Sequence, residues 1–245
     1  MKSMFELLRE LPLFRGVTHD KMAQTVGQAK FHFLKYPQGE TIITAGSPCQ
    51  HITFILSGKV RSTIINANGR FGVGQTLTAP DVIAPDFLFG RRTNFPATVV
   101  ALEPTSILQI SKSDYLKILY SDEVFMFNYL NTLSVNAQKA QEGIMSLTTC
   151  DIDERIAFWI IALTQPGATD IKLACRRRDL CSVFGVPRSI FVNALDEMKA
   201  KGYLDYTNTE LLISSRKAML ELLQKNAEDN YDDSTGEVHE MHSHA

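Results

Sequence analysis

Several polar side chains share one face of a predicted helix and could form hydrogen bonds to the edges of DNA bases. The opposite face carries apolar residues at the spacing i, i+3, i+4 and i+7, which predicts a buried helical face. The polar face is Arg188, Ser189, Val192 and Asn193, and the apolar face is Phe191, Ala194, Leu195 and Met198.

A second, shorter helix is expected just before it. Leu180, Val183 and Phe184 place apolar groups on one side of that helix, and Gly185 can adopt the positive φ that a tight turn needs. Pro187 fits the first turn of the next helix but not a helix interior. The pattern predicts a helix-turn-helix, with an ordinary helical hairpin as the alternative.

The charge around these helices favours a polyanionic partner. The whole chain of 245 residues has a formal net charge of −2, yet Lys172–Lys225 holds ten basic and six acidic residues, a net charge of +4. Six further acidic residues lie in Asn226–Ala245, which also carries His239, His242 and His244 and is expected to be a disordered, solvated tail that binds no metal. Tyr203–Ile213 resembles a β-hairpin wing beside the basic stretch.

The composition is that of a globular protein with room for two domains. No apolar run approaches the roughly 18 residues of a membrane span, and the N-terminal residues lack a signal-peptide core, so we expect a cytoplasmic protein. The cysteines show no CxxC or metal-ligand spacing and are expected to be reduced, and no cofactor or metal site is predicted. They are Cys49, Cys150, Cys175 and Cys181.

The N-terminal half is rich in short β-type runs separated by glycines, which predicts a sandwich or barrel and not a βαβ fold. Asn68-Gly69, between two such runs, predicts a two-residue hairpin turn. The expected strands are Thr41–Thr44, Ile52–Leu56, Val60–Asn66, Val73–Thr76, Val99–Ala101 and Ser106–Ile110.

A long helix should follow, because apolar residues recur at alternating spacings of four and three. This seam predicts a parallel homodimer, and a helix packed only on its own domain is the alternative. The seam residues are Met126, Leu130, Leu133, Ala137, Ala140, Ile144 and Leu147. Beyond them, Asp151–Glu154 resembles a capping box before a largely buried helix, Ile171–Ala174 is a possible strand, and Met219–Leu223 is a last apolar helix.

The stretch Gly39–Val60 resembles the opening of a cyclic-nucleotide-binding β-roll, with Gly39-Glu40, Gly46, Phe54 and Gly58 at the expected places. Leu11–Phe14 resembles its lead-in, and the order of the segments makes the chain similar to Crp/Fnr-type transcription regulators. The resemblance implies an α+β chain with an N-terminal antiparallel, jelly-roll-like β-roll, a long dimerisation helix and a C-terminal winged helix-turn-helix. The predicted parts are an effector domain over 1–112, the dimerisation helix over 113–148, the DNA-binding domain over 149–225 and the tail over 226–245.

The chain departs from cyclic-nucleotide binders where these hold ribose and phosphate. Ala84-Pro85 replaces their Gly-Glu pair, and Phe95-Pro96 replaces their Arg-Ser pair. Because these residues offer a phosphate no charge, and proline no N–H, we expect an effector other than cyclic AMP, hydrophobic or aromatic, or none. Arg91 and Arg92 could serve an acidic ligand or be exposed loop residues. The N-terminal cysteine cluster of iron–sulfur relatives is absent. Haem-binding relatives exist, and His32 or His51 could be haem ligands, but we expect both to lie on strand surfaces.

The resemblance also assigns roles at the DNA. Arg188 becomes the best candidate to read a base, with Ser189 and Asn193 beside it, while phosphate contacts are expected from Arg176, Arg177, Arg178 and Lys199. The predicted partners are double-stranded DNA with an inverted repeat, a second copy of the chain, an unknown small-molecule effector and RNA polymerase. The alternative is a ligand-binding regulatory subunit that acts through protein partners. No catalytic motif stands out, so an enzyme is not expected.

Overall fold

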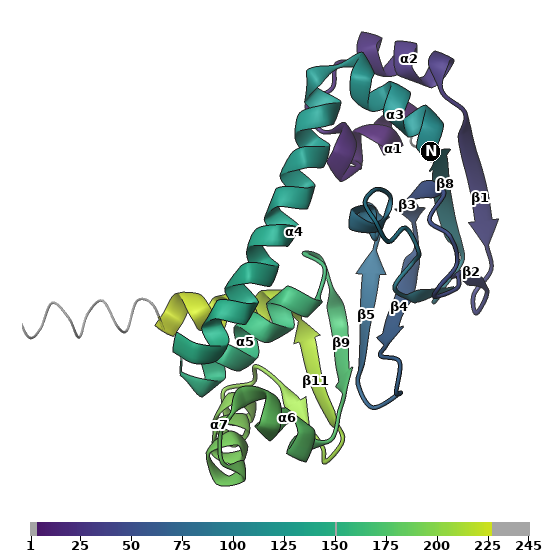
Figure 1. Ribbon diagram of the computed structural model, residues 1–245. Coiled ribbons are helices and arrows are strands. Elements are labelled where there is room, and N and C mark those ends of the chain that lie inside the picture. Colours follow the sequence, from purple (N-terminus) through teal and green to yellow (C-terminus); the bar gives the residue numbers. More distant parts are fainter. Residues whose placement is uncertain (1–3, 150, 227–245) are drawn as a thin grey trace, which may run out of the picture.

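The computed structural model describes residues 4–149 and 151–226, with helices at both ends of the molecule and strands between them (Figure 1). Its helices are α1 (Met4–Glu10), α2 (His19–Gln28), α3 (Lys112–Ser121), α4 (Glu123–Thr149), α5 (Ile152–Leu163), α6 (Arg177–Phe184), α7 (Arg188–Ala200) and residues 216–226, with short 3-10 helices η1 (Pro12–Phe14) and η2 (Pro85–Phe87). Its strands are β1 (Phe31–Tyr36), β2 (Thr41–Ile43), β3 (His51–Ser57), β4 (Lys59–Ile65), β5 (Gly72–Thr78), β6 (Asp81–Ile83), β7 (Thr98–Ala101), β8 (Thr105–Ser111), β9 (Thr169–Ala174), β10 (Asp205–Tyr206) and β11 (Glu210–Ser215).

The N-terminal strands form the antiparallel β-roll that the sequence predicts. One sheet has the order β1-β8-β3-β6, and β5-β4-β7-β2 are neighbours in the other. Phe54 on β3, Val60 on β4 and Leu108 on β8 are fully buried in one apolar core. The expected strands are all present, and the α+β fold class is confirmed. Strands β1 and β6 are not among the expected strands. In β6, three residues give too little pattern to distinguish a strand from a loop.

The hairpin between β4 and β5 is longer than predicted. Asn68-Gly69 does lie in the turn, but the connection runs over six residues, Asn66–Phe71. The side-chain Oδ1 of Asn66 accepts hydrogen bonds from the N–H groups of Arg70 and Phe71, both at 3.1 Å. This side chain closes a wider turn, so the two-residue turn prediction is wrong in length.

The long helix does not run unbroken over 113–148. Asp122 is extended (φ −161°, ψ 140°) and separates α3 from α4, and its side chain accepts a hydrogen bond from the N–H of Val124 at 2.9 Å. An aspartate that binds a nearby N–H begins a new helix more readily than it continues an old one. The helix that runs down the molecule therefore begins at Glu123. No helix among residues 4–149 and 151–226 is long and apolar enough to cross a membrane.

The C-terminal part is a winged helix-turn-helix. Helices α6 and α7 are joined by Gly185, which has φ +65°, and β10 and β11 form the antiparallel wing. Helix α5 begins after Asp151 as expected, but no side-chain hydrogen bond caps it, so the predicted capping box is not formed. Ile156 and Ile160 of α5 are fully buried, in agreement with the largely buried helix that the sequence predicts.

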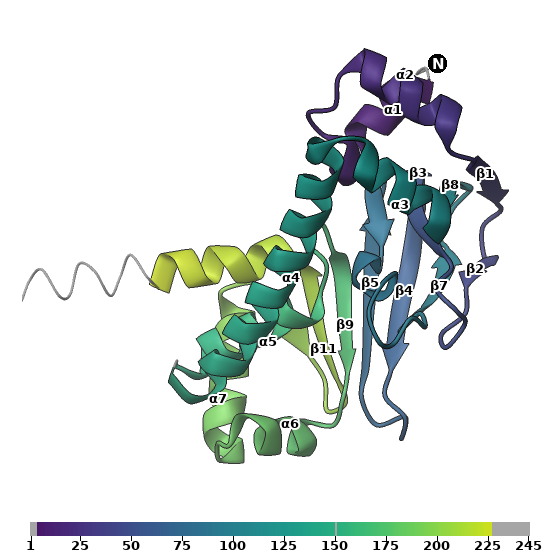
Figure 2. The same cartoon turned by 45° about the horizontal axis from the view of Figure 1, so that its top comes forward.

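The two halves share a sheet, which the sequence does not predict. Strand β9 pairs antiparallel with β11 on one side and with β5 of the β-roll on the other, with Gly72 opposite Ala174 and Gly74 opposite Lys172. The resulting order is β10-β11-β9-β5-β4-β7-β2. Figure 2 shows β11, β9, β5, β4 and β7 side by side below the N-terminal helices. The β-roll and the winged helix-turn-helix are thus hydrogen-bonded through their backbones.

Candidate functional site

The outward face of α7 lies at one extremity of the molecule. Its inner residues Phe191, Leu195 and Met198 are almost completely buried, as their helical spacing predicts, and Phe191 stacks on Phe184 with ring centroids 5.7 Å apart. In α6 Leu180 and Phe184 are buried as expected, but Val183 is 47% exposed. A stacked aromatic pair therefore fixes α7 on α6 and leaves its polar face in solvent.

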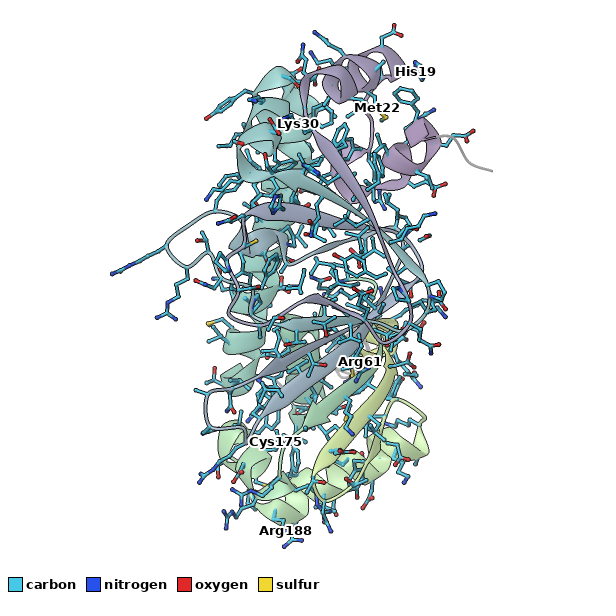
Figure 3. The ribbon with its side chains drawn as sticks, turned by 90° about the vertical axis from the view of Figure 1, so that its right-hand side faces the viewer. His19, Met22, Lys30, Arg61, Cys175 and Arg188 are labelled. Atoms are coloured by element: carbon cyan, nitrogen blue, oxygen red, sulfur yellow. The ribbon has the colours of Figure 1, made fainter. Side chains whose placement is uncertain are left out.

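The predicted base-reading residues are available on that face. Arg188, Ser189 and Asn193 are all exposed, and Arg188 lies at the very end of the molecule in Figure 3. Within the described residues, Arg188 forms no ion pair or side-chain hydrogen bond. Its guanidinium is free to donate two parallel hydrogen bonds, which is the geometry that guanine offers in the major groove.

The basic residues around the helix-turn-helix already have partners within the chain. Arg176 Nε lies 3.0 Å from Asp179 Oδ2, and Lys199 Nζ lies 2.6 Å from Asp205 Oδ1. The pKa of Lys199 is raised by this hydrogen bond to Asp205. Arg178 lies 3.7 Å from Asp179, which Arg176 also contacts. These pairs are exposed, so a phosphate could replace the carboxylate at small cost.

The wing contributes two residues that the sequence analysis did not select. Arg177 lies over the ring of Tyr206, 5.6 Å from its centroid, and its side chain also donates to Asn208 Oδ1. The hydroxyl of Tyr206 donates to Asp196 on α7 at 2.6 Å. Tyr206 thus connects the wing, the basic residues and α7. A lone tyrosine in a short strand gives no sequence signal for such a role.

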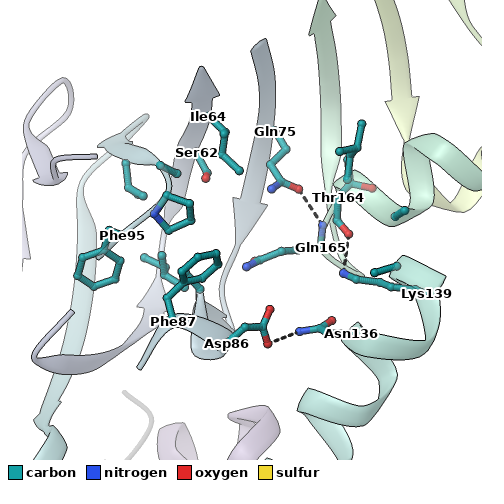
Figure 4. A pocket seen from close by; sticks show the side chains of 18 residues that line it. Ser62, Ile64, Gln75, Asp86, Phe87, Phe95, Asn136, Lys139, Thr164 and Gln165 are labelled. Atoms are coloured by element: carbon teal, nitrogen blue, oxygen red, sulfur yellow. Dashed lines mark hydrogen bonds between the residues drawn. The ribbon is translucent and has the colours of Figure 1, made fainter. Parts of the chain in front are cut away.

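A cavity of about 240 Å³ lies between the β-roll, α4 and the end of α5 (Figure 4). Most of its wall is apolar and comes from the β-roll, where Ile64, Phe87 and Phe95 line it. Asn136, Lys139 and Ala140 of α4 line the opposite side, together with Thr164 and Gln165. Residues far apart in the sequence therefore form one small apolar chamber with a polar edge.

The polar edge is held together by three hydrogen bonds. Lys139 Nζ donates to the carbonyl of Thr164 at 3.0 Å, and the N–H of Gln165 donates to Gln75 Oε1 at 2.9 Å. Asn136 Nδ2 donates to Asp86 Oδ1 at 2.7 Å. Burial lowers the pKa of Lys139, and nearby Arg216 lowers it further. Lys139 and Gln75, which both line the cavity, thus bind the corner between α5 and β9, the turn that contains Thr164 and Gln165.

The part of the chain that holds the α7 face and the cavity is similar to known proteins. The family model described as cyclic nucleotide-binding domain matches residues 33–122. The CRP-like cAMP-activated global transcriptional regulator of Mycobacterium tuberculosis is 23% identical over 88% of this chain and 98% of its own. The cyclic AMP receptor protein of Thermus thermophilus is 24% identical over 78% of this chain and 87% of its own. Over most of its length the chain is a distant homologue of Crp/Fnr transcription regulators.

The solved catabolite activator protein of Thermus thermophilus aligns with 86% of this chain and 97% of its own, at 20% identity and a TM-score of 0.49. The curated relatives are transcription regulators and not enzymes, and this chain is a CRP/FNR-like DNA-binding transcription regulator. Members of the family bind DNA and a small effector. The alternative of a regulatory subunit that acts only through protein partners is therefore disfavoured.

Of the four residues that replace the family's nucleotide contacts, three line the cavity, and the fourth is buried outside it. Ala84, Phe95 and Pro96 line the cavity. Pro85 does not line it, and its carbonyl accepts a hydrogen bond from Tyr129 at 3.0 Å. Ala84 has φ +46°, a left-handed conformation that glycine adopts more easily, so the loop keeps the backbone of a Gly position without the glycine.

The arginines that could have served an acidic ligand lie elsewhere. Arg91 and Arg92 are exposed and are not among the residues that line the cavity. The cation that does line it is Lys139, which the sequence analysis missed. The sequence does place Lys139 beside the seam residue Ala140. Only the packing of α4 on the β-roll, however, shows which face of α4 lines the cavity.

The predicted dimer seam is only partly on the outer side of α4. Leu130, Ala137, Ala140 and Ile144 are exposed, although Ala140 also lines the cavity, whereas Met126, Leu133 and Leu147 pack against the core of their own chain. The exposed stripe shares every second residue with the predicted seam. At the other positions it contains the residue that follows the predicted one in the sequence. It consists of Phe127, Leu130, Ser134, Ala137, Gln141, Ile144 and Thr148. The dimer itself stays a prediction.

Proposed function

We propose that this Crp/Fnr protein acts in the cytoplasm as a homodimer that binds an inverted repeat and is gated by a small effector other than cyclic AMP. The observation that carries the DNA half is the exposed polar face of α7, where Arg188 has no partner within the described residues. Dimerisation through the outer stripe of α4 would place two such helices roughly 34–36 Å apart, one turn of DNA. Bound there, the protein would also meet RNA polymerase.

Selection of bound duplexes from a random pool, with and without an extract of cell metabolites, tests this proposal. We expect enriched sequences with dyad symmetry and half-sites about 10 base pairs apart, centre to centre. Enriched sequences without dyad symmetry would contradict the dimeric mode of binding. Enrichment that is identical with and without metabolites would contradict gating by an effector in that extract.

The cavity supports an effector with an apolar body and one acidic group. Phe87 and Phe95 offer ring surfaces, and Lys139 is the one Lys or Arg among the described residues that line the cavity. A carboxylate could replace the Thr164 carbonyl as the acceptor of Lys139, and Arg216 nearby adds positive charge. A cyclic nucleotide would find Ala84, Phe95 and Pro96 where the family's phosphate and ribose contacts lie. The loss of two or three such contacts would cost roughly two to six orders of magnitude in affinity.

Titration calorimetry distinguishes these effectors. Cyclic AMP and cyclic GMP should bind with millimolar or weaker affinity, while aromatic carboxylates should bind more tightly than the matched neutral amides. Lys139→Met should remove the preference for the carboxylate and leave the binding of the amide unchanged. Micromolar cyclic AMP binding that Lys139→Met abolishes would show that this lysine holds a phosphate, and would overturn the proposed effector class.

A further inference from the structure

We propose that the turn between β4 and β5, which belongs to the β-roll, is part of the DNA-contacting surface and that Arg70 binds the DNA backbone. We call Asn66–Phe71 the hairpin tip, Arg176–Arg178 the basic flank and Thr207–Thr209 the wing turn. The inference rests on the proposed function, because it adds a contact to the same DNA complex. It assigns a DNA contact to the domain that the sequence associates with the effector.

The shared sheet brings the hairpin tip beside the basic flank. Gly72, the first residue of β5, lies opposite Ala174 of β9, and Ala174 lies opposite Glu210 of β11. Neighbouring strands are about 4.8 Å apart, so the start of β5 lies roughly 10 Å from the wing strand. In Figures 1 and 2 the β4–β5 turn lies at the same end of the sheet as the connection from β9 to α6.

Backbone hydrogen bonds fix the basic flank at this end. The N–H of Cys175 donates to the carbonyl of Thr209 at 2.8 Å, and the N–H of Arg177 donates to the carbonyl of Asn208 at 3.1 Å. Figure 3 shows Cys175 in the same end of the molecule as Arg188. The hairpin tip, the basic flank and the wing turn therefore line one edge, at the end of the molecule that carries Arg188.

The hairpin tip is also anchored on the DNA-binding half. Phe71 packs on Trp159 of α5, with ring centroids 5.4 Å apart, and Trp159 in turn contacts Phe184 of α6 at 5.4 Å. The N–H of Arg70 donates to the side chains of Asn66 and Asn68, at 3.1 and 3.0 Å. The turn thus has a defined shape and a defined position relative to α6.

The chemistry of the hairpin tip suits a phosphate. Arg70, Asn66 and Asn68 are exposed, and within the described residues the side chain of Arg70 has no acidic partner. From Thr41 to Pro80 the sequence contains no aspartate or glutamate. Arginine and asparagine side chains make many of the backbone contacts in protein–DNA complexes, and a surface without carboxylates does not repel the duplex.

The same two strands line the cavity. Ser62 and Ile64 of β4 and Gln75 of β5 are in its wall, and the hairpin tip is the turn that joins these strands. A ligand that shifts β4 against β5 would therefore move a DNA contact directly. An effector could therefore change DNA binding in two ways. One is through the hairpin tip, and the other is through the segment between α5 and β9 that Lys139 and Gln75 bind.

The test compares Arg70→Ala with Lys59→Ala, which removes the same charge from an exposed residue at the opposite end of β4. Affinity for the selected duplex and for a scrambled duplex is measured by fluorescence anisotropy over a range of salt concentrations. Arg70→Ala should weaken both duplexes by the same factor, about three- to tenfold, and reduce the slope of log affinity against log salt by about 0.9 per lost contact. Lys59→Ala should keep the wild-type slope.

A second variant, Asn68→Asp, keeps an oxygen that can accept the Arg70 N–H and adds a negative charge, so it should also weaken both duplexes. A wild-type slope for Arg70→Ala, with wild-type affinity for both duplexes, would overturn the inference and leave the proposed function intact. A wild-type protein that binds neither duplex more tightly than an unrelated protein of similar charge would overturn both.

Discussion

Arg188, Ser189 and Asn193 all come from α7, whereas the cavity takes Ile64 from β4 and Lys139 from α4. In the first region a single helix decides which residues share a face, because its period places them there. In the second region no two walls come from the same stretch of chain. The DNA-reading face is a local property of the sequence, and the effector cavity is a property of the assembled fold.

Helix α4 takes part in both kinds of surface. Ala140 faces the cavity, whose shape depends on the β-roll, and Ala137 lies on the outer stripe that helical period alone defines. The two residues are about one helical turn apart. Distant segments determine the surroundings of Ala140, whereas the helical period determines that Ala137 lies on the outer stripe.

The largest effect is expected at the outer stripe of α4. Ala137→Glu would bury two unpaired charges in a symmetric dimer, which costs several kcal/mol per charge and should lower affinity for the inverted repeat by about a hundredfold or more. Light scattering should show monomers with unchanged circular dichroism. Ala137→Ser, which stays small and uncharged, is the control and should remain dimeric. A dimeric Ala137→Glu protein at micromolar concentration would show that the stripe is not the interface.

A somewhat smaller effect is expected beneath the DNA-reading face. Phe191 is fully buried against Phe184, so Phe191→Ala should lower the free energy of unfolding by about 3–5 kcal/mol. Its neighbour Ile190 is 49% exposed, and Ile190→Ala should change stability much less. Urea denaturation followed by tryptophan fluorescence measures both, since Trp159 contacts Phe184. Equal losses for the two variants would contradict the assigned buried face.

The DNA-reading face itself should show base selectivity. Arg188→Ala should cost about 1–3 kcal/mol on the preferred duplex and relax one base position in each half-site. Arg177→Ala, in the basic flank, should weaken all sequences about equally, because a phosphate contact carries no base information. Binding to a set of single-base variants measures both. An Arg188→Ala protein with unchanged selectivity would remove Arg188 from the role of base reader.

The smallest effect concerns a carboxyl group beside the corner between α5 and β9. Burial raises the pKa of Asp81 to about 6, although the N–H of Val82 donates to it at 2.8 Å. The folded protein then holds this proton more tightly than the unfolded chain, so the stability that Asp81 contributes falls as pH rises from about 4 to about 6 and stays low above that. Asp81→Asn should therefore raise the free energy of unfolding by about 1–2 kcal/mol at pH 7.5 and leave it unchanged at pH 4.

Asp205 provides the opposite case. Its pKa is lowered by the hydrogen bond from Lys199, so its contribution to stability is present at neutral pH and is lost as pH falls through its folded pKa. Asp205→Asn should destabilise at pH 7.5, with the difference vanishing in acid. Denaturant unfolding at the two pH values measures both variants. A stabilising effect of Asp205→Asn at neutral pH would contradict the assigned ion pair.

Elements that depend on neighbours along the chain could be predicted without the structure. The helix-turn-helix follows from helical period, from a glycine that accepts positive φ and from a proline that suits a helix start, all within Arg176–Gly202. The β-roll strands follow from short β-type runs between glycines. The resemblance to Crp/Fnr regulators rested on the order of these segments, and relatives that cover most of the chain confirm it.

Contacts between segments that are far apart in the sequence became known from the fold alone. Lys139 lines a cavity because α4 packs against the β-roll, and the helical period of α4 is equally compatible with a lysine in solvent. Strand β9 pairs with β5 because each has unpaired backbone N–H and C=O groups along one edge. Nothing in the sequence of either strand selects that partner. Spacing along one chain records local geometry, whereas contacts between distant segments depend on packing and hydrogen bonding over the whole molecule.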